Sequence, residues 1–106
     1  MLERHYAPRA TLEISACGER RSRELLAAGQ HVGLLSVSVP DGERLPSGAL
    51  EFVQMPPDVA GYAARLYAEL HRLDDLGVSH IVVDAVPETE EWDAVRDRLS
   101  RAATAV

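Results

Sequence analysis

The sequence contains no lysine, a single cysteine (Cys17) and few aromatic residues, which make up 5% of its 106 residues. One cysteine cannot form a disulfide within the chain, so a disulfide-stabilised scaffold is excluded and a reducing cytoplasm is the expected compartment. The longest apolar runs, such as residues 81–83, are far too short to span a bilayer, and no secretory signal opens the chain. We therefore expect a cytoplasmic protein that does not associate with membranes.

The charge balance is acidic. Arginine supplies all 11 basic residues against 17 acidic ones, which gives a formal net charge of −6. Such a chain repels a phosphate backbone, so we expect no direct contact with nucleic acid. A hydrophobic content of 46% and a charged content of 26% are typical of a globular protein, and the length predicts a single domain.

The hydrophobic pattern changes period several times and predicts strands that alternate with helices. Strands are predicted over residues 11–16, 31–39, 49–54 and 80–86, with a short helix over residues 19–28 and a loop over residues 40–48. A longer helix is predicted after Asp58 from apolar residues that share one helical face: Val59, Ala63, Leu66, Leu70 and Leu73. A last helix is predicted after Thr89, its expected cap, from the apolar stripe Trp92, Val95, Leu99 and Ala102.

This alternation predicts an α/β fold. We expect a three-layer sandwich with a mostly parallel sheet of about four strands and helices on both faces. Gly29 and Gly77 stand where the first two helices should end. The chain divides into an extended arm at residues 1–10 and one domain at residues 11–106. The pattern leaves the strand order open, but ligands of such sheets bind at the carboxyl ends of the strands.

A candidate anion site lies where the first strand gives way to the first helix. Gly18 precedes this helix, whose N-terminal N–H groups and partial positive charge favour an anion. Arg20, Arg21 and Arg23 crowd the first turns, where they oppose the helix dipole unless an anion lies nearby. ATP or AMP would be the ligand of such a site, although the sequence has neither G-x-G-x-x-G nor the P-loop pattern. The alternative is a solvated arginine face on an acidic protein, with no cofactor.

The sequence assigns no catalytic residue and no metal site. The histidines are scattered, and none pairs with another at the spacing of a zinc site. Cys17 has no C-x-x-C partner, and no nucleophile lies beside a base in a known motif. Asp84 lies near the carboxyl end of a predicted strand, where it could contact a ribose or position a water, although capping the next loop is the favoured interpretation. Asp74 and Asp75 are interpreted as solvated turn residues.

The N-terminal arm carries the first motif of a resemblance to a known family. Residues 4–12 read RHYAPRATL, and the stretches HVGLL, AARLYAELHRLDDLGVSHIVV and AVRDRLSRAA follow in order. Together they resemble the C-terminal domain of two-domain threonylcarbamoyl-AMP synthases, in which a YrdC-like catalytic domain comes first. The resemblance covers nearly the whole chain.

This resemblance implies a Rossmann-like α/β domain linked to the synthesis of threonylcarbamoyl-adenylate from threonine, bicarbonate and ATP. That intermediate supplies the threonylcarbamoyladenosine modification of tRNA. The family's chemistry lies in the YrdC-like domain, which is outside this sequence, and the HYAP segment belongs to a linker that reaches toward the catalytic pocket. By that match, the residues that contact a YrdC-like partner are Arg4, His5, Tyr6 and Pro8.

The sequence differs from the family pattern at two places. Glu3 stands where the family usually has a tyrosine, and Leu2 where it has a basic residue. Residues 90–93 (EEWD) replace a glycine-rich stretch, and their carboxylates would repel a phosphate. The leading interpretation is a non-catalytic accessory domain for a YrdC-like partner, with a homodimer also open. The alternative is a small nucleotide- or anion-binding sensor domain outside that pathway.

Overall fold

The computed structural model of the chain describes residues 8–38 and 50–103. The strands are β1 (Thr11–Ser15), β2 (Val32–Ser36), β3 (Leu50–Gln54) and β4 (His80–Asp84). The helices are α1 (Gly18–Ala27), α2 (Val59–Asp75) and α3 (Asp93–Ala102), and the 3-10 turn η2 (Glu90–Trp92) precedes α3. The elements follow the predicted order, although β2 and β4 end earlier than predicted, and the loop predicted over residues 40–48 lies outside the described residues. None of the described helices combines the length and the apolar composition needed to cross a lipid bilayer.

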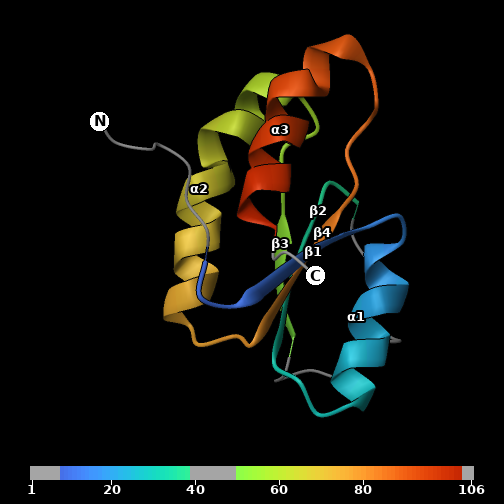
Figure 1. Ribbon diagram of the computed structural model, residues 1–106, viewed down its shortest axis with the longest axis vertical. Coiled ribbons are helices and arrows are strands. Elements are labelled where there is room, and N and C mark those ends of the chain that lie inside the picture. The colour runs from blue at the N-terminus through green and yellow to red at the C-terminus, as the bar shows by residue number, and fades with distance from the viewer. Residues whose placement is uncertain (1–7, 39–49, 104–106) are drawn as a thin grey trace.

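The strands form one parallel sheet in the order β1-β4-β2-β3. α1 covers one face of this sheet, and α2 and α3 cover the opposite face (Figure 1). This is the predicted three-layer α/β sandwich, with a Rossmann-like arrangement. β4 is the last strand in the sequence, yet it lies between β1 and β2. Its run from Ile81 to Val83 is 0% exposed, because a central parallel strand is covered on both faces.

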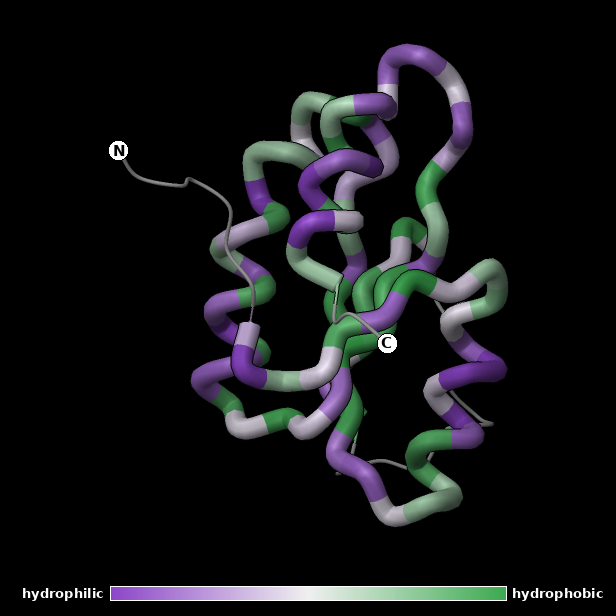
Figure 2. The backbone as a smooth tube through the Cα atoms, in the orientation of Figure 1, coloured by the Kyte–Doolittle hydropathy of each residue, from purple (hydrophilic) through white to green (hydrophobic). Residues whose placement is uncertain are grey.

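Two apolar clusters hold the helices on the sheet. The larger cluster lies under α2 and α3, where Leu66 and Leu70 of the predicted helical stripe and Val83 of β4 are at most 1% exposed. The smaller cluster lies under α1 and joins Leu25 to Val82. Figure 2 shows hydrophobic residues concentrated along the central strands. Complete burial of one large apolar side chain stabilises the fold by roughly 1.5–3 kcal/mol, so these clusters determine where each helix lies.

The ends of the helices follow the sequence signals only in part. Gly29 and Gly77 have φ angles of +87° and +84°, so glycine ends α1 and α2 as predicted. Thr89 makes no side-chain capping hydrogen bond to η2, contrary to prediction. The interpretation of Asp74 as a solvated turn residue is also wrong, because this side chain is buried. Its carboxylate accepts hydrogen bonds from the backbone N–H groups of residues 9 and 10 at 3.0 and 3.1 Å, which ties the start of β1 to the end of α2.

Candidate functional site

The carboxyl ends of β1 and β4 lie side by side, and the chain leaves them toward opposite faces of the sheet. β1 leads into α1 on one face, whereas β4 leads through η2 into α3 on the other (Figure 1). Neighbouring strands whose connections diverge in this way leave a crevice between them, which is the usual ligand position in open parallel sheets. The fold therefore predicts a ligand site among the side chains at this edge of the sheet.

Asp84 is the last residue of β4 and joins several segments at this edge. Its Oδ1 accepts a hydrogen bond from the backbone N–H of Gly18, and its Oδ2 accepts one from the hydroxyl of Ser36, both at 2.5 Å. The Ser36 hydroxyl in turn accepts a hydrogen bond from the N–H of Ser38 at 3.0 Å. The carboxylate thus caps α1 from a neighbouring strand, which corrects the interpretation that it caps the loop after β4.

Gly18 is required at the start of α1 by the close approach of this carboxylate. A Cβ atom added there would lie 2.5 Å from Asp84 Oδ1 and 2.8 Å from Leu34 Cδ1. Only a residue without a side chain lets the helix N-terminus come so near. The positive end of the α1 dipole and the N–H of Gly18 are therefore already directed at a negative charge.

A cavity of about 250 Å³ opens beside Asp84. Its walls come from the ends of β2 and β4, from α2 and from η2, and they include Ser36, Ser38, Tyr62, Asp84, Pro87 and Trp92. The rings of Tyr62 and Trp92 meet edge to face, with centroids 5.3 Å apart. Arg96 holds the wall that follows β4, because its guanidinium donates to the carbonyl oxygens of Pro87 and Thr89 at 2.8 and 3.2 Å.

The hydroxyl of Tyr62 has no hydrogen-bond partner among the described residues, although this side chain is only 1% exposed. Burial and the nearby negative charge of Asp84 raise the pKa of the hydroxyl, so it keeps its proton at neutral pH. Most buried polar groups of folded proteins have a partner. An unpaired hydroxyl on a buried residue that lines a cavity is therefore a candidate for a ligand contact.

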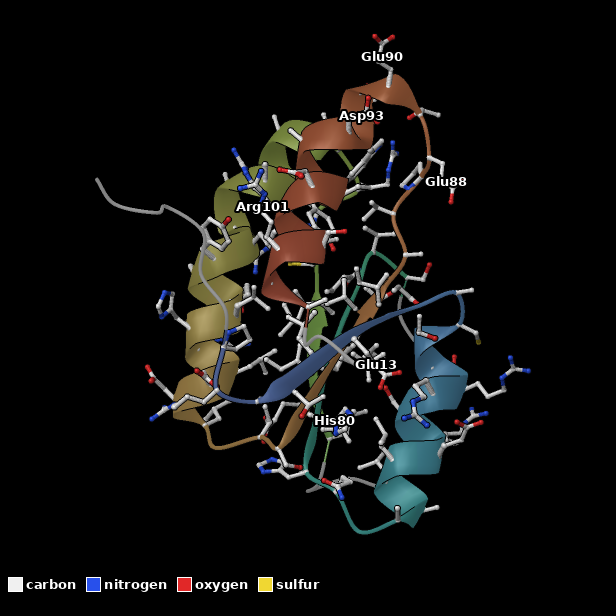
Figure 3. All side chains as sticks on the ribbon, viewed as in Figure 1. Glu13, His80, Glu88, Glu90, Asp93 and Arg101 are labelled. Atoms are coloured by element: carbon white, nitrogen blue, oxygen red, sulfur yellow. The ribbon has the colours of Figure 1, made fainter. Side chains whose placement is uncertain are left out.

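The cavity has a negative environment. No basic side chain is among the described residues that line it. Glu88 and Glu90 lie beside the wall residues Pro87 and Trp92 along the connection from β4 to α3, and Figure 3 shows both pointing outward, whereas Asp93 pairs with Arg96. Negative charge at the cavity and around it disfavours a phosphate or another anion.

The structure pairs two of the three arginines predicted for the anion site with carboxylates. Arg21 Nε lies 2.7 Å from Glu13 on β1, and Arg21 Nη1 lies 3.0 Å from Glu24 on α1. Arg23 pairs with Glu19 on the preceding turn of the same helix. These contacts offset the guanidinium charges that an anion would use.

Arg20 is the third of these arginines, and it is exposed without an ion pair among the described residues. Gly18, the remaining member of the predicted site, gives its N–H to Asp84. An anion at the N-terminus of α1 would therefore have to displace a carboxylate. The anion site stays a prediction, and the positions of these residues give it no further support.

Glu13 links three elements on the face of the sheet that α1 covers. Arg21 donates to its two carboxylate oxygens at 2.7 and 3.2 Å, and His80 Nε2 lies 3.3 Å from Oε1. Figure 3 shows Glu13 and His80 together beside α1. The hydrogen bond from Arg21 is the largest influence and holds the pKa of Glu13 below its ordinary value. In the described part of the chain, no group of three or more histidine, cysteine or acidic side chains is arranged to hold a metal ion.

The predicted partner-contact residues Arg4, His5 and Tyr6 lie outside the described residues, whereas Pro8 is described and partly buried. The hydrogen bonds to Asp74 fix the backbone directly after Pro8. Because β1 begins at residue 11, this anchor lies at the amino edge of the sheet, opposite the cavity. The contact roles of the arm stay predictions.

Ser36 and Tyr62 are not among the site residues predicted from the sequence. Tyr62 precedes Leu66 and Leu70 at helical spacing, so the apolar stripe of α2 could have included it. Ser36 ends an apolar strand, where a lone hydroxyl is a usable signal. No spacing in the sequence shows that these side chains line one cavity with Asp84, because the pairing of β2 with β4 brings them together.

Comparison with known families agrees with the resemblance noted in the sequence. The family described as "Threonylcarbamoyl-AMP synthase, C-terminal domain" matches residues 1–104. Comparisons with curated proteins and with solved structures give no match. The family match spans both the N-terminal arm and the described α/β fold. The chain therefore belongs to the family of threonylcarbamoyl-AMP synthase C-terminal domains.

Proposed function

We propose that the chain is a non-catalytic accessory domain that serves a YrdC-like catalytic partner in the synthesis of threonylcarbamoyl-adenylate for tRNA modification. The observation that carries this proposal is the family match over residues 1–104. In the two-domain synthases that the chain resembles, catalysis belongs to the YrdC-like domain. A domain of the C-terminal type therefore acts on that catalytic unit and does not replace it.

The chemistry of the candidate site supports an accessory role. Ser36 donates to Asp84, but no histidine is among the described residues that line the cavity, so this serine has no imidazole base beside it. The described lining also has no basic side chain to hold the phosphates of ATP. Adenylate formation needs positive charge that stabilises the negative charge developing around phosphorus. The charged group among the described residues of this cavity is the negative carboxylate of Asp84.

The N-terminal arm is the proposed contact with the partner. Arg4, His5, Tyr6 and Pro8 match the linker motif of the two-domain synthases. Asp74 anchors the backbone immediately after this motif. A fixed exit point lowers the conformational entropy that is lost when the arm docks on a partner, which favours binding.

A calorimetric titration with a YrdC-like catalytic protein that lacks this domain tests the contact. We expect saturable binding by the whole chain and an affinity about tenfold lower for the His5→Ala, Tyr6→Ala double variant, because aromatic anchors dominate many interfaces. Arg98→Ala, at an exposed position on α3, is the control and should bind as the unmodified chain does. Absence of binding by the whole chain, or equal affinity of the arm variant, would contradict the proposed contact.

Assays of the isolated chain test the non-catalytic part of the proposal. With threonine, bicarbonate and ATP present, the chain alone should form no threonylcarbamoyl-adenylate. Pyrophosphate release is the measurement. A rate that stays constant per mole of chain through repeated purification would show that the domain itself catalyses the reaction.

A further inference from the structure

We propose that the cavity beside Asp84 binds a neutral ligand with two adjacent hydroxyl groups, such as a ribose ring or another polyol without a phosphate. The proposal rests on Ser36, Tyr62, Asp84 and Trp92, which all line the cavity. It is independent of the accessory role proposed above, because it concerns a site within this chain at the edge of the sheet opposite residues 9 and 10.

Asp84 keeps unused acceptor capacity on both carboxylate oxygens. Each oxygen of an ionised carboxylate can accept two hydrogen bonds. Oδ1 accepts one from Gly18 and Oδ2 accepts one from Ser36, which leaves one acceptor position on each atom. Hydroxyl groups on neighbouring carbons present two O–H donors side by side, so a vicinal diol can bind both positions at once.

Tyr62 requires a ligand that can accept a hydrogen bond, whereas Asp84 requires one that can donate. Its hydroxyl is a donor that has no acceptor among the described residues, although the side chain is only 1% exposed and lines the cavity. An ammonium group offers donors only, so it would satisfy Asp84 and leave the Tyr62 proton unpaired. A hydroxyl group donates its proton to one partner and accepts from another. A hydroxylated ligand is therefore the class that uses Asp84 and Tyr62 together.

The remaining walls select for a small and uncharged molecule. No basic side chain is among the described residues that line the cavity, so a phosphate on the ligand would meet Asp84 without compensation. Pro87 and Trp92 supply apolar surface for the C–H groups of a sugar ring. A volume of about 250 Å³ lies at the small end of ligand sites, which suits a sugar ring.

Trp92 provides a direct readout, because it lines the cavity and is the single tryptophan of the chain. Ribose and adenosine are neutral diols, 2′,3′-dideoxyadenosine lacks both hydroxyls, and AMP adds a phosphate. We expect ribose and adenosine to change the fluorescence of Trp92 saturably at millimolar concentration. Dideoxyadenosine, which loses both hydroxyl contacts to Asp84, and AMP, whose phosphate is repelled by this carboxylate, should each bind at least about tenfold more weakly than adenosine.

Tyr62→Phe removes the unpaired hydroxyl and nothing else. Its affinity for adenosine should fall about tenfold, whereas its melting temperature should stay the same or rise, because the ligand-free protein loses no hydrogen bond. Tyr67→Phe changes the same residue type on the same helix, outside the cavity lining, and should bind adenosine like the unmodified chain. Asp84→Asn should also lose the response, with its circular dichroism spectrum showing whether the fold is kept.

Three results would overturn the proposal. They are no fluorescence response to either neutral diol, binding of AMP at least as tight as that of adenosine, and unchanged adenosine affinity in Tyr62→Phe. Tighter binding of AMP would instead favour the anion site predicted around Gly18. None of these measurements includes a YrdC-like protein, so their failure is distinguishable from failure of the accessory role.

Discussion

Asp84 joins three segments that are far apart in the sequence, through the N–H of Gly18 and the hydroxyl of Ser36. Hydrogen bonds to an ionised carboxylate are stronger than neutral ones, and the N-terminus of α1 adds a favourable dipole. The same carboxylate occupies the position that an anion would take at this helix. One acidic side chain therefore positions α1 and makes the nearby cavity negative.

Gly18→Ala should destabilise the fold by about 1–3 kcal/mol, because the new Cβ would overlap Asp84 and Leu34. The distances to Asp84 Oδ1 and Leu34 Cδ1 would be 2.5 and 2.8 Å. Urea unfolding measures the change. In an Asp84→Ala background the cost should shrink, since one of the two overlaps is gone, and an equal cost in both backgrounds would contradict this view of the contact.

Glu13 makes the stability of the fold depend on pH. The hydrogen bond from Arg21 lowers the pKa of Glu13 in the folded chain from its ordinary value of 4.5. A lowered folded pKa gives stability that is complete above the unfolded pKa and is lost as the pH falls through the folded pKa. The melting temperatures of the unmodified chain and of Glu13→Gln should therefore differ most above the ordinary pKa of 4.5 and converge as the pH falls below it. A constant difference across this range would show that the ionised form of Glu13 adds no stability.

At the scale of elements, periodicity predicts the helices and strands because a helix or an edge strand buries one face, whereas a central strand buries both. The stripe of α2 identified Leu66 and Leu70 correctly, and the apolar run of β4 indicated a strand covered on both sides. Contacts between elements could not be predicted in the same way. The burial of Asp74 has no signal in the sequence, because its partners, the N–H groups before β1, lie 64 and 65 residues away.

The helix stripe can be tested with a matched pair of substitutions. Leu70→Ala should reduce the free energy of unfolding by about 2–5 kcal/mol, because Leu70 is 0% exposed between α2 and the sheet. Leu76→Ala removes the same atoms at a position that is 45% exposed, and it should change this free energy by no more than about 0.5 kcal/mol. Similar losses from the two variants would mean that the packing of α2 is misassigned.

At the scale of the whole molecule, the sequence predicts the fold class but not the order of the strands in the sheet. Composition and periodicity predict the three-layer α/β class, and they place Asp84 at a strand end. The insertion of β4 between β1 and β2 depends on long-range packing, and this order brings Ser36 and Asp84 to the cavity that Tyr62 lines from α2. The sequence motifs therefore led to the family, whereas the candidate ligand site required the structure.

The rate of threonylcarbamoyl-adenylate formation by a YrdC-like catalytic protein, measured with and without this chain, tests the accessory role most directly. We predict that the rate changes saturably as the chain is added, and that the His5→Ala, Tyr6→Ala variant, shown to be folded by its melting temperature, leaves the rate unchanged. The Arg98→Ala control should act as the unmodified chain does. A rate that stays the same at every concentration of the folded chain would contradict the accessory role.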